Sequence, residues 1–475
     1  MRRRILVLLL AFLPLLLRLY PERDEYVALI QEGDAHASLK EYSFAARAYR
    51  QAATIRPGSP APLLRLGNTF LAQAWYDRAQ AALLMAHSSG GWTPELRLQM
   101  GQLYQGMGLK AEAIAQWEAA LAQEPDLAQA RLQLGWAYLS SELWDGASEA
   151  FEEILTRRDS VHRECWQSAR YALGLLLAPK EPEQALHHLQ IAAGGDDRAM
   201  ADKAIILGAD LQQIPPDADP AHAAALLGQA YLRVEAWSLA RRMLAQAVTA
   251  EPAYAEVRAY LGHAMDHLGQ PAEAERQLLL AVRLAPAETL PRYLLGLHYR
   301  RHGKPGEAAL QFRQALEQDQ RNAALYAELG KAWLAQHNYV DAEIAFRSAA
   351  ELEPEHQGFQ LLLARFYVEQ LIKVRSLGLP AARKAVQLDP TDARAFDVLG
   401  WTYYLLGSPE QAENALSRAV ALDPELPAAR YHLGVVLLRR GRLAEANYQL
   451  WRAVDLDRQG YYRSQAWRTL GLPSE

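Results

Sequence analysis

The sequence predicts an all-α fold, a solenoid of about twelve helix pairs preceded by an N-terminal hydrophobic segment. Three regularities in the 475 residues support this prediction. Glycine recurs every 34 residues, alanine follows each of these glycines after twelve residues, and a large apolar residue follows after sixteen. Proline often closes the unit. The glycines are Gly33, Gly67, Gly101 and Gly135, then Gly228, Gly262, Gly296 and Gly330, and finally Gly400 and Gly434.

Residues 391–424 show the unit most clearly, with two amphipathic helical patterns on either side of a turn at 407–409. Gly400, Ala412 and Ala419 are small, as required where two helices cross closely. The large Leu416 fills the hollow of the next helix, as a ridge fits a groove. Pro424 ends the second helix, because proline lacks the N–H and restricts the residue before it. A helix pair this short cannot bury its apolar face alone, so neighbouring pairs must stack.

This spacing and these residue types resemble the tetratricopeptide repeat family over roughly residues 25–458. Ten copies in phase make the resemblance specific. It implies a right-handed stack of antiparallel helix pairs that binds proteins or peptides without catalysis.

Composition agrees with a folded protein, since 51% of the residues are hydrophobic and 22% are charged. The net charge is −5. Residues 1–20 contain four arginines and no acid, so the remainder carries −9, which argues against a general nucleic-acid binder. Cys165 is the only cysteine, which excludes an intrachain disulfide and a cysteine metal cluster.

Residues 1–20 begin with three arginines and continue with an apolar run from Ile5 to Leu17. Those residues span only about 20 Å as a helix, against about 30 Å of hydrocarbon. Arg18 and Tyr20 suit the membrane interface, and no small-residue cleavage site follows. We therefore favour a membrane anchor, with the repeats on the extracytoplasmic side of a bacterial cell. A cleaved secretory signal, and hence a secreted protein, is the alternative.

The repeats divide into two predicted sub-arrays. Residues 25–195 hold repeats one to five, and residues 221–458 hold repeats six to twelve. Residues 196–220 add one helical pattern and a proline-rich turn, which we interpret as the junction. In the tenth repeat, the run 378–380 (Gly-Leu-Pro) predicts a disturbed second helix. Residues 459–475 predict a C-terminal capping helix.

The sequence shows little that points to catalysis or metal binding. His263 and His267 stand at i and i+4, as a metal site would require, and His298 and His302 repeat the spacing. The inverted zincin pattern would need glutamate where Asp266 stands, and no third ligand is evident. The repeats also leave no room for a catalytic domain. We therefore expect no enzyme activity, no cofactor and no metal.

In the family that the sequence resembles, the first helix of each pair lines a concave groove. The lining residues lie six and three before the key glycine, and one, four and five after it. In repeats six to ten these positions are rich in basic residues, which favour a partner with acidic groups. The expected peptide-binding residues are Arg233, Glu256, His263, His267, Tyr293, Arg300, Arg301, Lys331 and Arg365, with further acids at Asp266 and Glu369.

The leading functional hypothesis is a membrane-anchored, non-catalytic scaffold that binds an extended peptide or a partner helix in this groove. The alternative is an accessory or regulatory subunit of an envelope enzyme complex, such as a glycosyltransferase. Neither hypothesis involves nucleic acid.

Overall fold

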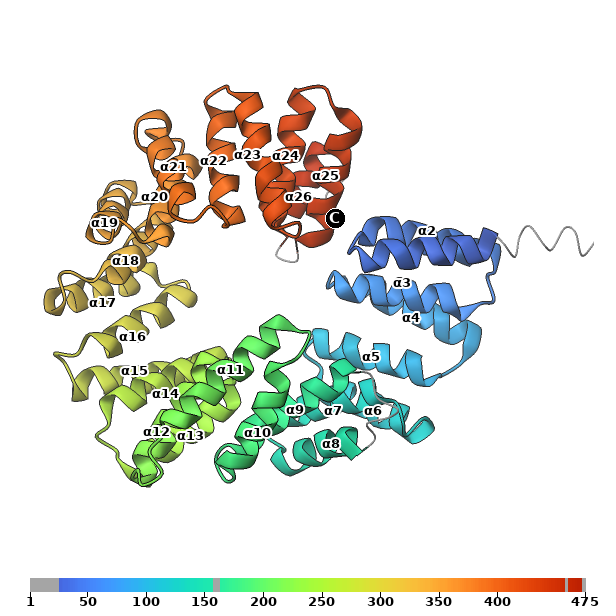
Figure 1. Ribbon diagram of the computed structural model, residues 1–475, viewed down its shortest axis with the longest axis horizontal. Helices are drawn as coiled ribbons and strands as arrows, with labels where there is room; N and C mark the ends of the chain where they lie inside the picture. The colour runs from blue at the N-terminus through green and yellow to red at the C-terminus, as the bar shows by residue number, and fades with distance from the viewer. Residues whose placement is uncertain (1–24, 157–162, 458–459, 472–475) are drawn as a thin grey trace, which may run out of the picture. The chain divides into compact units, whose positions relative to one another are not determined.

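The computed structural model describes residues 25–156, 163–457 and 460–471, and the secondary structure in these ranges is helical with no strand (Figure 1). The predicted all-α repeat fold is thus confirmed for the described part of the chain. The predicted N-terminal segment, residues 1–20, lies outside the described residues. Among the residues that are described, no helix combines the length and the apolarity needed to cross a membrane.

The chain forms two compact units, residues 131–390 and residues 1–130 together with 391–475. The second of these begins with a helical stretch at residues 25–38. Its further helices are α2 (Tyr42–Ile55), α3 (Pro60–Ala72), α4 (Tyr76–Gly90), α5 (Pro94–Gly106), α6 (Lys110–Gln123), α22 (Ala393–Leu405), α23 (Pro409–Leu422), α24 (Pro427–Arg439), α25 (Leu443–Leu456) and α26 (Tyr461–Thr469).

The unit at residues 131–390 starts within α7 and continues as helix pairs interrupted by α11. Its helices are α7 (Ala128–Ser140), α8 (Trp144–Thr156), α9 (Arg163–Leu177), α10 (Pro182–Ala193), α11 (Arg198–Gln213), α12 (Pro220–Arg233), α13 (Trp237–Ala250), α14 (Ala255–His267), α15 (Pro271–Leu284), α16 (Thr289–Arg301), α17 (Pro305–Gln318), α18 (Ala323–Ala335), α19 (Tyr339–Leu352), α20 (Gln357–Glu369), the π-helical turn η2 (Val374–Gly378) and α21 (Leu379–Leu388).

The key glycine of each repeat receives the large apolar side chain of the second helix. A Cβ at Gly262 would lie 2.7 Å from Cγ of Leu278, and one at Gly330 would lie 2.6 Å from Phe346. Such separations are too short for real carbon atoms, so only glycine lets the helices approach this closely. We expected the large residue to fill the hollow of the next helix. The structure shows such a contact, since the ring centroid of Phe346 lies 5.3 Å from that of Phe366 in the next helix, and the large residue packs on the first helix of its own pair as well.

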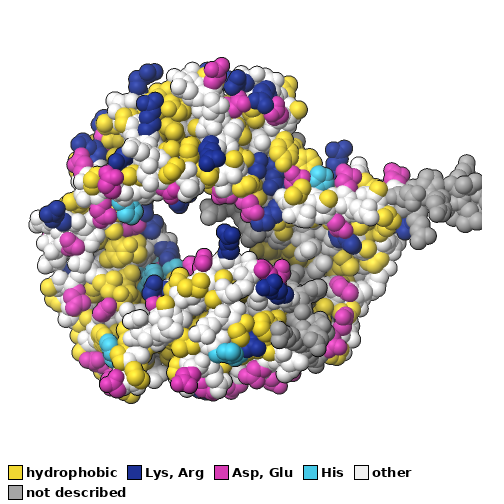
Figure 2. Space-filling model, viewed as in Figure 1, with side chains coloured by type: hydrophobic (Ala, Val, Ile, Leu, Met, Phe, Trp, Pro, Cys, Tyr) yellow, Lys and Arg dark blue, Asp and Glu magenta, His cyan; other side chains and the backbone are white. Residues whose placement is uncertain are grey.

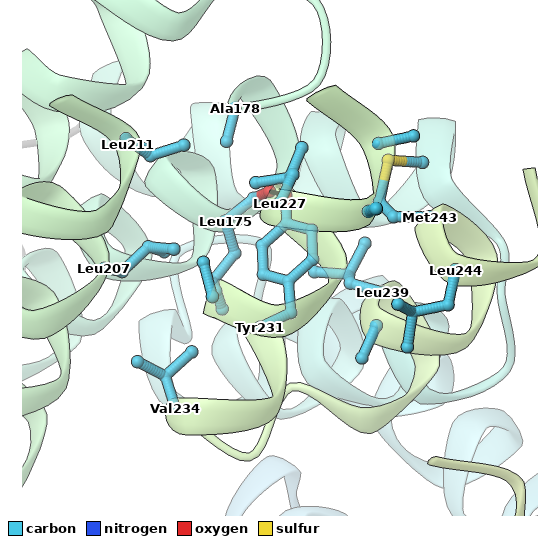
Figure 3. Close-up of a cluster of buried hydrophobic side chains, with 14 of the residues drawn as sticks. Leu175, Ala178, Leu207, Leu211, Leu227, Tyr231, Val234, Leu239, Met243 and Leu244 are labelled. Atoms are coloured by element: carbon cyan, nitrogen blue, oxygen red, sulfur yellow. Dashed lines mark hydrogen bonds between the residues drawn. The ribbon is translucent and has the colours of Figure 1, made fainter. Parts of the chain in front are cut away.

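The extra helix α11 belongs to a continuous core. Leu207 and Leu211 of α11 lie in the same buried cluster as residues of α9, α10, α12, α13 and α14. At its centre, the buried Tyr231 of α12 donates a hydrogen bond of 2.6 Å to the carbonyl of Leu175 in α9 (Figure 3). The predicted junction at residues 196–220 therefore lies inside the unit at 131–390, where α11 packs on both α10 and α12.

The second helix of the tenth repeat is disturbed, as the sequence predicts. The π-helical turn η2 precedes α21, which has only ten residues. Lys373, just before η2, has a φ of 47°, and Pro380 stands in the first turn of α21. Proline fits there because the N–H groups at a helix start have no partner within the helix.

In the unit that holds the first and last described helices, α2 packs against α25. Asp455 of α25 accepts two hydrogen bonds from Ser43, one from the backbone N–H at 3.0 Å and one from the hydroxyl at 2.5 Å. Arg452 donates to the carbonyl of Lys40 at 2.6 Å. The C-terminal helix α26 packs Trp467 against α25, with Trp75 beside it at 6.2 Å between ring centroids.

Candidate functional site

The nine predicted binding residues lie on the first helices of five successive repeats, α12, α14, α16, α18 and α20. Helical periodicity explains this placement, because offsets of −6, −3, +1, +4 and +5 from one residue share a face of a helix. We call the surface formed by these nine residues the binding surface. Four of its cations, Arg233, Arg300, Arg301 and Lys331, are 38–62% exposed through their side chains.

Most cations of the binding surface are paired with an acid. Glu328 of α18 bridges two of them, since its carboxylate lies 3.0 Å from Nε of Arg300 and 2.7 Å from Nζ of Lys331. Arg233 pairs with Asp210 of α11, and Arg365 pairs with Glu369 of its own helix at 2.8 Å. Asp210 and Glu328 were not among the expected residues, because neither occupies one of the family's offsets.

These acids reduce the predicted excess of positive charge. The sequence alone sets five cations against Glu256, Asp266 and Glu369, whereas Asp210 and Glu328 bring the count to five acids. Figure 2 likewise shows Lys and Arg side chains interspersed with Asp and Glu over the visible face. The binding surface and the acids around it are therefore together close to neutral.

Glu328 and Asp210 nevertheless lie deeper than the cations they hold. The side chain of Glu328 is 12% exposed, against 39% for both Arg300 and Lys331. Asp210 is 18% exposed beneath Arg233, which is 62% exposed. The outer layer of the surface is thus cationic. A guanidinium carries five N–H donors, so one ion pair leaves donors to hold a second carboxylate.

Asp266 is the centre of a second cluster that joins α14 to α16. Its Oδ1 accepts from Nδ1 of His298 at 2.8 Å and from Nε2 of His302 at 2.6 Å. Its Oδ2 accepts from Arg301 at 2.5 Å. Burial alone would raise the pKa of Asp266, but the hydrogen bonds from both histidines and the charge of Arg301 outweigh burial and lower the pKa to about 2. The carboxylate is therefore ionised and both ring nitrogens donate.

The other histidine pair lies against an aromatic ring. His267 stacks on Trp237 with ring centroids 3.7 Å apart and planes at 8°, and His263 meets the same ring edge-on. Burial lowers the pKa of His263 to about 4. Arg301 donates to Nε2 of His267 at 2.7 Å, so this nitrogen is unprotonated. Both rings are thus neutral at pH 7.

Tyr293 and Glu256 occupy less prominent places in the surface. Burial, followed by the charge of nearby Glu328, raises the pKa of Tyr293. Glu256 lies in the first turn of α14, and burial, followed by the charge of Glu256, raises the pKa of Tyr260. The structure thus brings together His263, His267 and Arg301, and separately Arg300, Lys331 and Tyr293. Arg233 and Arg365 each form a separate ion pair, with Asp210 and Glu369 respectively.

Sequence reasoning missed Trp237, Asp210 and Glu328, and it did not foresee that Asp266 contacts His298 and His302. One signal was available for the last contact. Asp266 and His298 lie 32 residues apart, close to the 34-residue period, so they occupy comparable positions on the first helices of successive repeats. Such positions face each other when repeats stack.

The family model described as a tetratricopeptide repeat matches residues 98–163, 293–370 and 398–460. No curated protein matches the chain significantly. Among solved structures, the chain is similar to the APC/C hetero-tetramer Cut9-Hcn1, at 16% identity and a TM-score of 0.41, covering 87% of this chain and 96% of that one.

Two further solved structures are similar. The yeast Tom70 structure gives 17% identity and a TM-score of 0.35 over 87% of this chain and 95% of that one. MamA from Desulfovibrio magneticus RS-1 gives 24% identity and a TM-score of 0.32 over 36% of this chain and 97% of that one. Since these scores are below 0.5, no functional argument rests on the three likenesses.

The family matches and the regular spacing agree on one type of repeat, and proteins of this type generally mediate protein–protein interaction. The chain carries tetratricopeptide repeats at residues 98–163, 293–370 and 398–460.

Proposed function

We propose that this protein is a non-catalytic scaffold that binds an extended acidic peptide, or an acidic partner helix, on the binding surface. The observation that carries the proposal is the layering of charge. Exposed Arg300, Arg301 and Lys331 project from acids that are at most 12% exposed. Acids beneath the cations hold them in place before a ligand arrives, which lowers the entropic cost of binding.

The exposed guanidinium groups account for specificity. A neutral peptide would leave the exposed guanidinium donors to water, whereas a carboxylate can bind them in a bidentate manner. Positions on successive first helices repeat about every 34 residues, so an extended ligand would meet a cation in each repeat from α16 to α20. Tyr293 and the ring of His267 add apolar contact area between these cations.

The test changes Arg300, Arg301 and Lys331 together to glutamine, which keeps an N–H donor for Glu328 and Asp266. The probe is a fluorescent peptide rich in glutamate and aspartate, with its glutamine and asparagine counterpart as the neutral reference. We expect a roughly tenfold loss of affinity for the acidic peptide and a weaker dependence on salt, at unchanged helical content.

The matched control removes three cations from second helices of the same unit, as R276Q/R347Q/K384Q. These residues lie on α15, α19 and α21 and each pairs with an acid. The control should bind the acidic peptide as the wild type does. Equal losses in both triple variants would show a general charge effect and contradict the proposed surface.

We further propose that residues 1–20 anchor the protein in a membrane, with the repeats on the extracytoplasmic side. The support is the basic start followed by the apolar run from Ile5 to Leu17. Mass spectrometry of protein from the membrane fraction should find these residues present. An N-terminus beyond Tyr20 would indicate a cleaved signal and a secreted protein, and cysteine labelling that places the repeats in the cytoplasm would reverse the orientation.

Co-purification from detergent-solubilised membranes separates the scaffold from the alternative role. A scaffold should bring down several partners in substoichiometric amounts. A single enzyme recovered in a stable one-to-one complex would instead favour an accessory subunit of an envelope enzyme.

A further inference from the structure

The side chains around Asp266 have the composition of a metal site. Three donor atoms, Oδ1 of Asp266, Nδ1 of His298 and Nε2 of His302, all lie within 4.8 Å of one another. Asp266 lies on α14 and His298 on α16, which are the first helices of two successive repeats. His302 directly follows the C-terminal end of α16. The two ring nitrogens already point at the same carboxylate oxygen, at 2.8 and 2.6 Å.

We propose that Asp266, His298 and His302 bind a divalent zinc ion that ties α14 to α16. Two imidazole nitrogens and one carboxylate oxygen suit zinc, whereas calcium and magnesium prefer all-oxygen ligands. His298 and His302 stand at i and i+4, which places both rings on one side of the helix. Asp266 is the third ligand that the sequence does not reveal.

The fit requires the oxygen–nitrogen separations to open and the two ring nitrogens, which lie within 4.8 Å of each other, to move closer together. Around a tetrahedral zinc ion with bonds of about 2.0–2.2 Å, neighbouring ligand atoms lie roughly 3.4 Å apart. The oxygen–nitrogen separations of 2.8 and 2.6 Å must therefore open by less than 1 Å. Each nitrogen that binds the ion gives up its proton, which leaves to solvent or moves to the other nitrogen of the ring.

The surroundings support ligation by Asp266. The side chains of Asp266 and His298 are each 2% exposed, so the two ligands are held in place by packing. Arg301 occupies the other carboxylate oxygen and leaves Oδ1 to the ion, which is how ligating carboxylates are commonly oriented. His302 is 31% exposed, which gives the ion a way in and leaves room for a water as the fourth ligand.

The polar cluster has a second explanation, in which the hydrogen bonds to Asp266 serve packing alone. The two explanations make different predictions, since only a metal site would bind zinc stoichiometrically. The metal proposal does not depend on peptide binding, because its ligands are not the cations that hold the acidic peptide.

The experiment titrates untagged, full-length protein with zinc in competition with a coloured chelator. We expect one zinc ion per chain in the wild type. D266N, which keeps the shape of the side chain, and H302A, which changes a partly exposed residue, should each weaken zinc binding at least ~10-fold.

The neighbouring pair supplies a matched control, since His263 and His267 have the same i and i+4 spacing on α14. H263A/H267A should bind zinc as the wild type does. Cobalt in place of zinc should give a visible absorption band in the wild type and the control, and this band should be lost in H302A.

Zinc should also raise the melting temperature of the wild type but not that of H302A, because a ligand that binds only the folded state stabilises it. Absence of stoichiometric zinc binding by the wild type would overturn the proposal. Binding that survives in both D266N and H302A would overturn it as well, since the ion would then lie elsewhere.

Discussion

At the scale of single residues, the repeat depends on glycines that carry no Cβ at a helix crossing. At Gly262 an added Cβ would meet Cγ of Leu278 at 2.7 Å and the backbone carbonyl of Ala274 at 3.0 Å. The side chain of Leu278 can shift, but the carbonyl belongs to a helix and cannot move alone. A larger residue at position 262 would therefore push α14 and α15 apart.

Gly262→Leu should destabilise the fold by about 1–3 kcal/mol through overpacking. Gly208→Ala in α11 is the matched control, because its Cβ would meet only Leu186, at 4.0 Å. Without a clash, this change should stabilise the helix by about 0.5–1 kcal/mol. Urea unfolding followed by circular dichroism measures both. A similar midpoint for the Gly262 variant and the wild type would contradict the helix register.

At the scale of elements, the position of α11 decides whether the array is continuous. The helix stands outside the 34-residue spacing, which favours a break between sub-arrays. Yet Leu207 is fully buried with residues of both flanking repeats, and Ile205 on the other face is 55% exposed. Burial on one face and exposure on the other is what an integrated amphipathic helix requires.

Leu207→Ala should cost about 2–5 kcal/mol, because it leaves a cavity in the shared core. Ile205→Ala should change the free energy of unfolding by less than about 0.5 kcal/mol, since its side chain lies largely in water. Thermal melts of the two variants make the comparison. If Leu207→Ala were as mild as its control, α11 would be a loosely attached junction, in agreement with the predicted sub-array boundary.

At the scale of the whole molecule, residues 412 positions apart meet within one compact unit. Asp455 accepts both hydrogen bonds from Ser43 through Oδ1, near Arg452 and Glu41. Burial raises the pKa of Asp455 to about 7, and the hydrogen bonds from Ser43 and the charge of Arg452 only partly oppose this rise. The folded state therefore binds a proton that the unfolded chain, with an ordinary pKa of 3.8, releases.

This difference makes stability depend on pH in a defined direction. The contribution of the protonated carboxyl is complete below about pH 4 and is lost as the pH rises through 7, and its upper bound is about 4 kcal/mol. Asp455→Asn imitates the protonated form, so it should melt well above the wild type at pH 8, by a smaller margin at pH 5 and close to it below pH 4. Melting curves that keep a constant offset across this range would contradict the shifted pKa.

The sequence by itself determined the repeat, the helical class and the position of each crossing. Gly330, Ala342 and Phe346 mark a crossing because close packing leaves few residue types that fit, and the pattern recurs at a constant interval. The disturbed second helix of the tenth repeat was also readable, because Gly378 and Pro380 act on the local backbone. These features depend on residues that are close together in the chain, and their spacing can be read from the sequence.

Only the tertiary structure decided which polar side chains meet. Glu328 bridges Arg300 and Lys331, Asp266 gathers His298 and His302, and Ser43 reaches Asp455, over separations from 3 to 412 residues. Such contacts depend on how far each helix is rotated and on the rotamer of each long side chain. Helix rotation and side-chain rotamers produce no periodic pattern in the sequence. Many polar residues are tolerated at an exposed position, whereas few apolar residues fit a given core position.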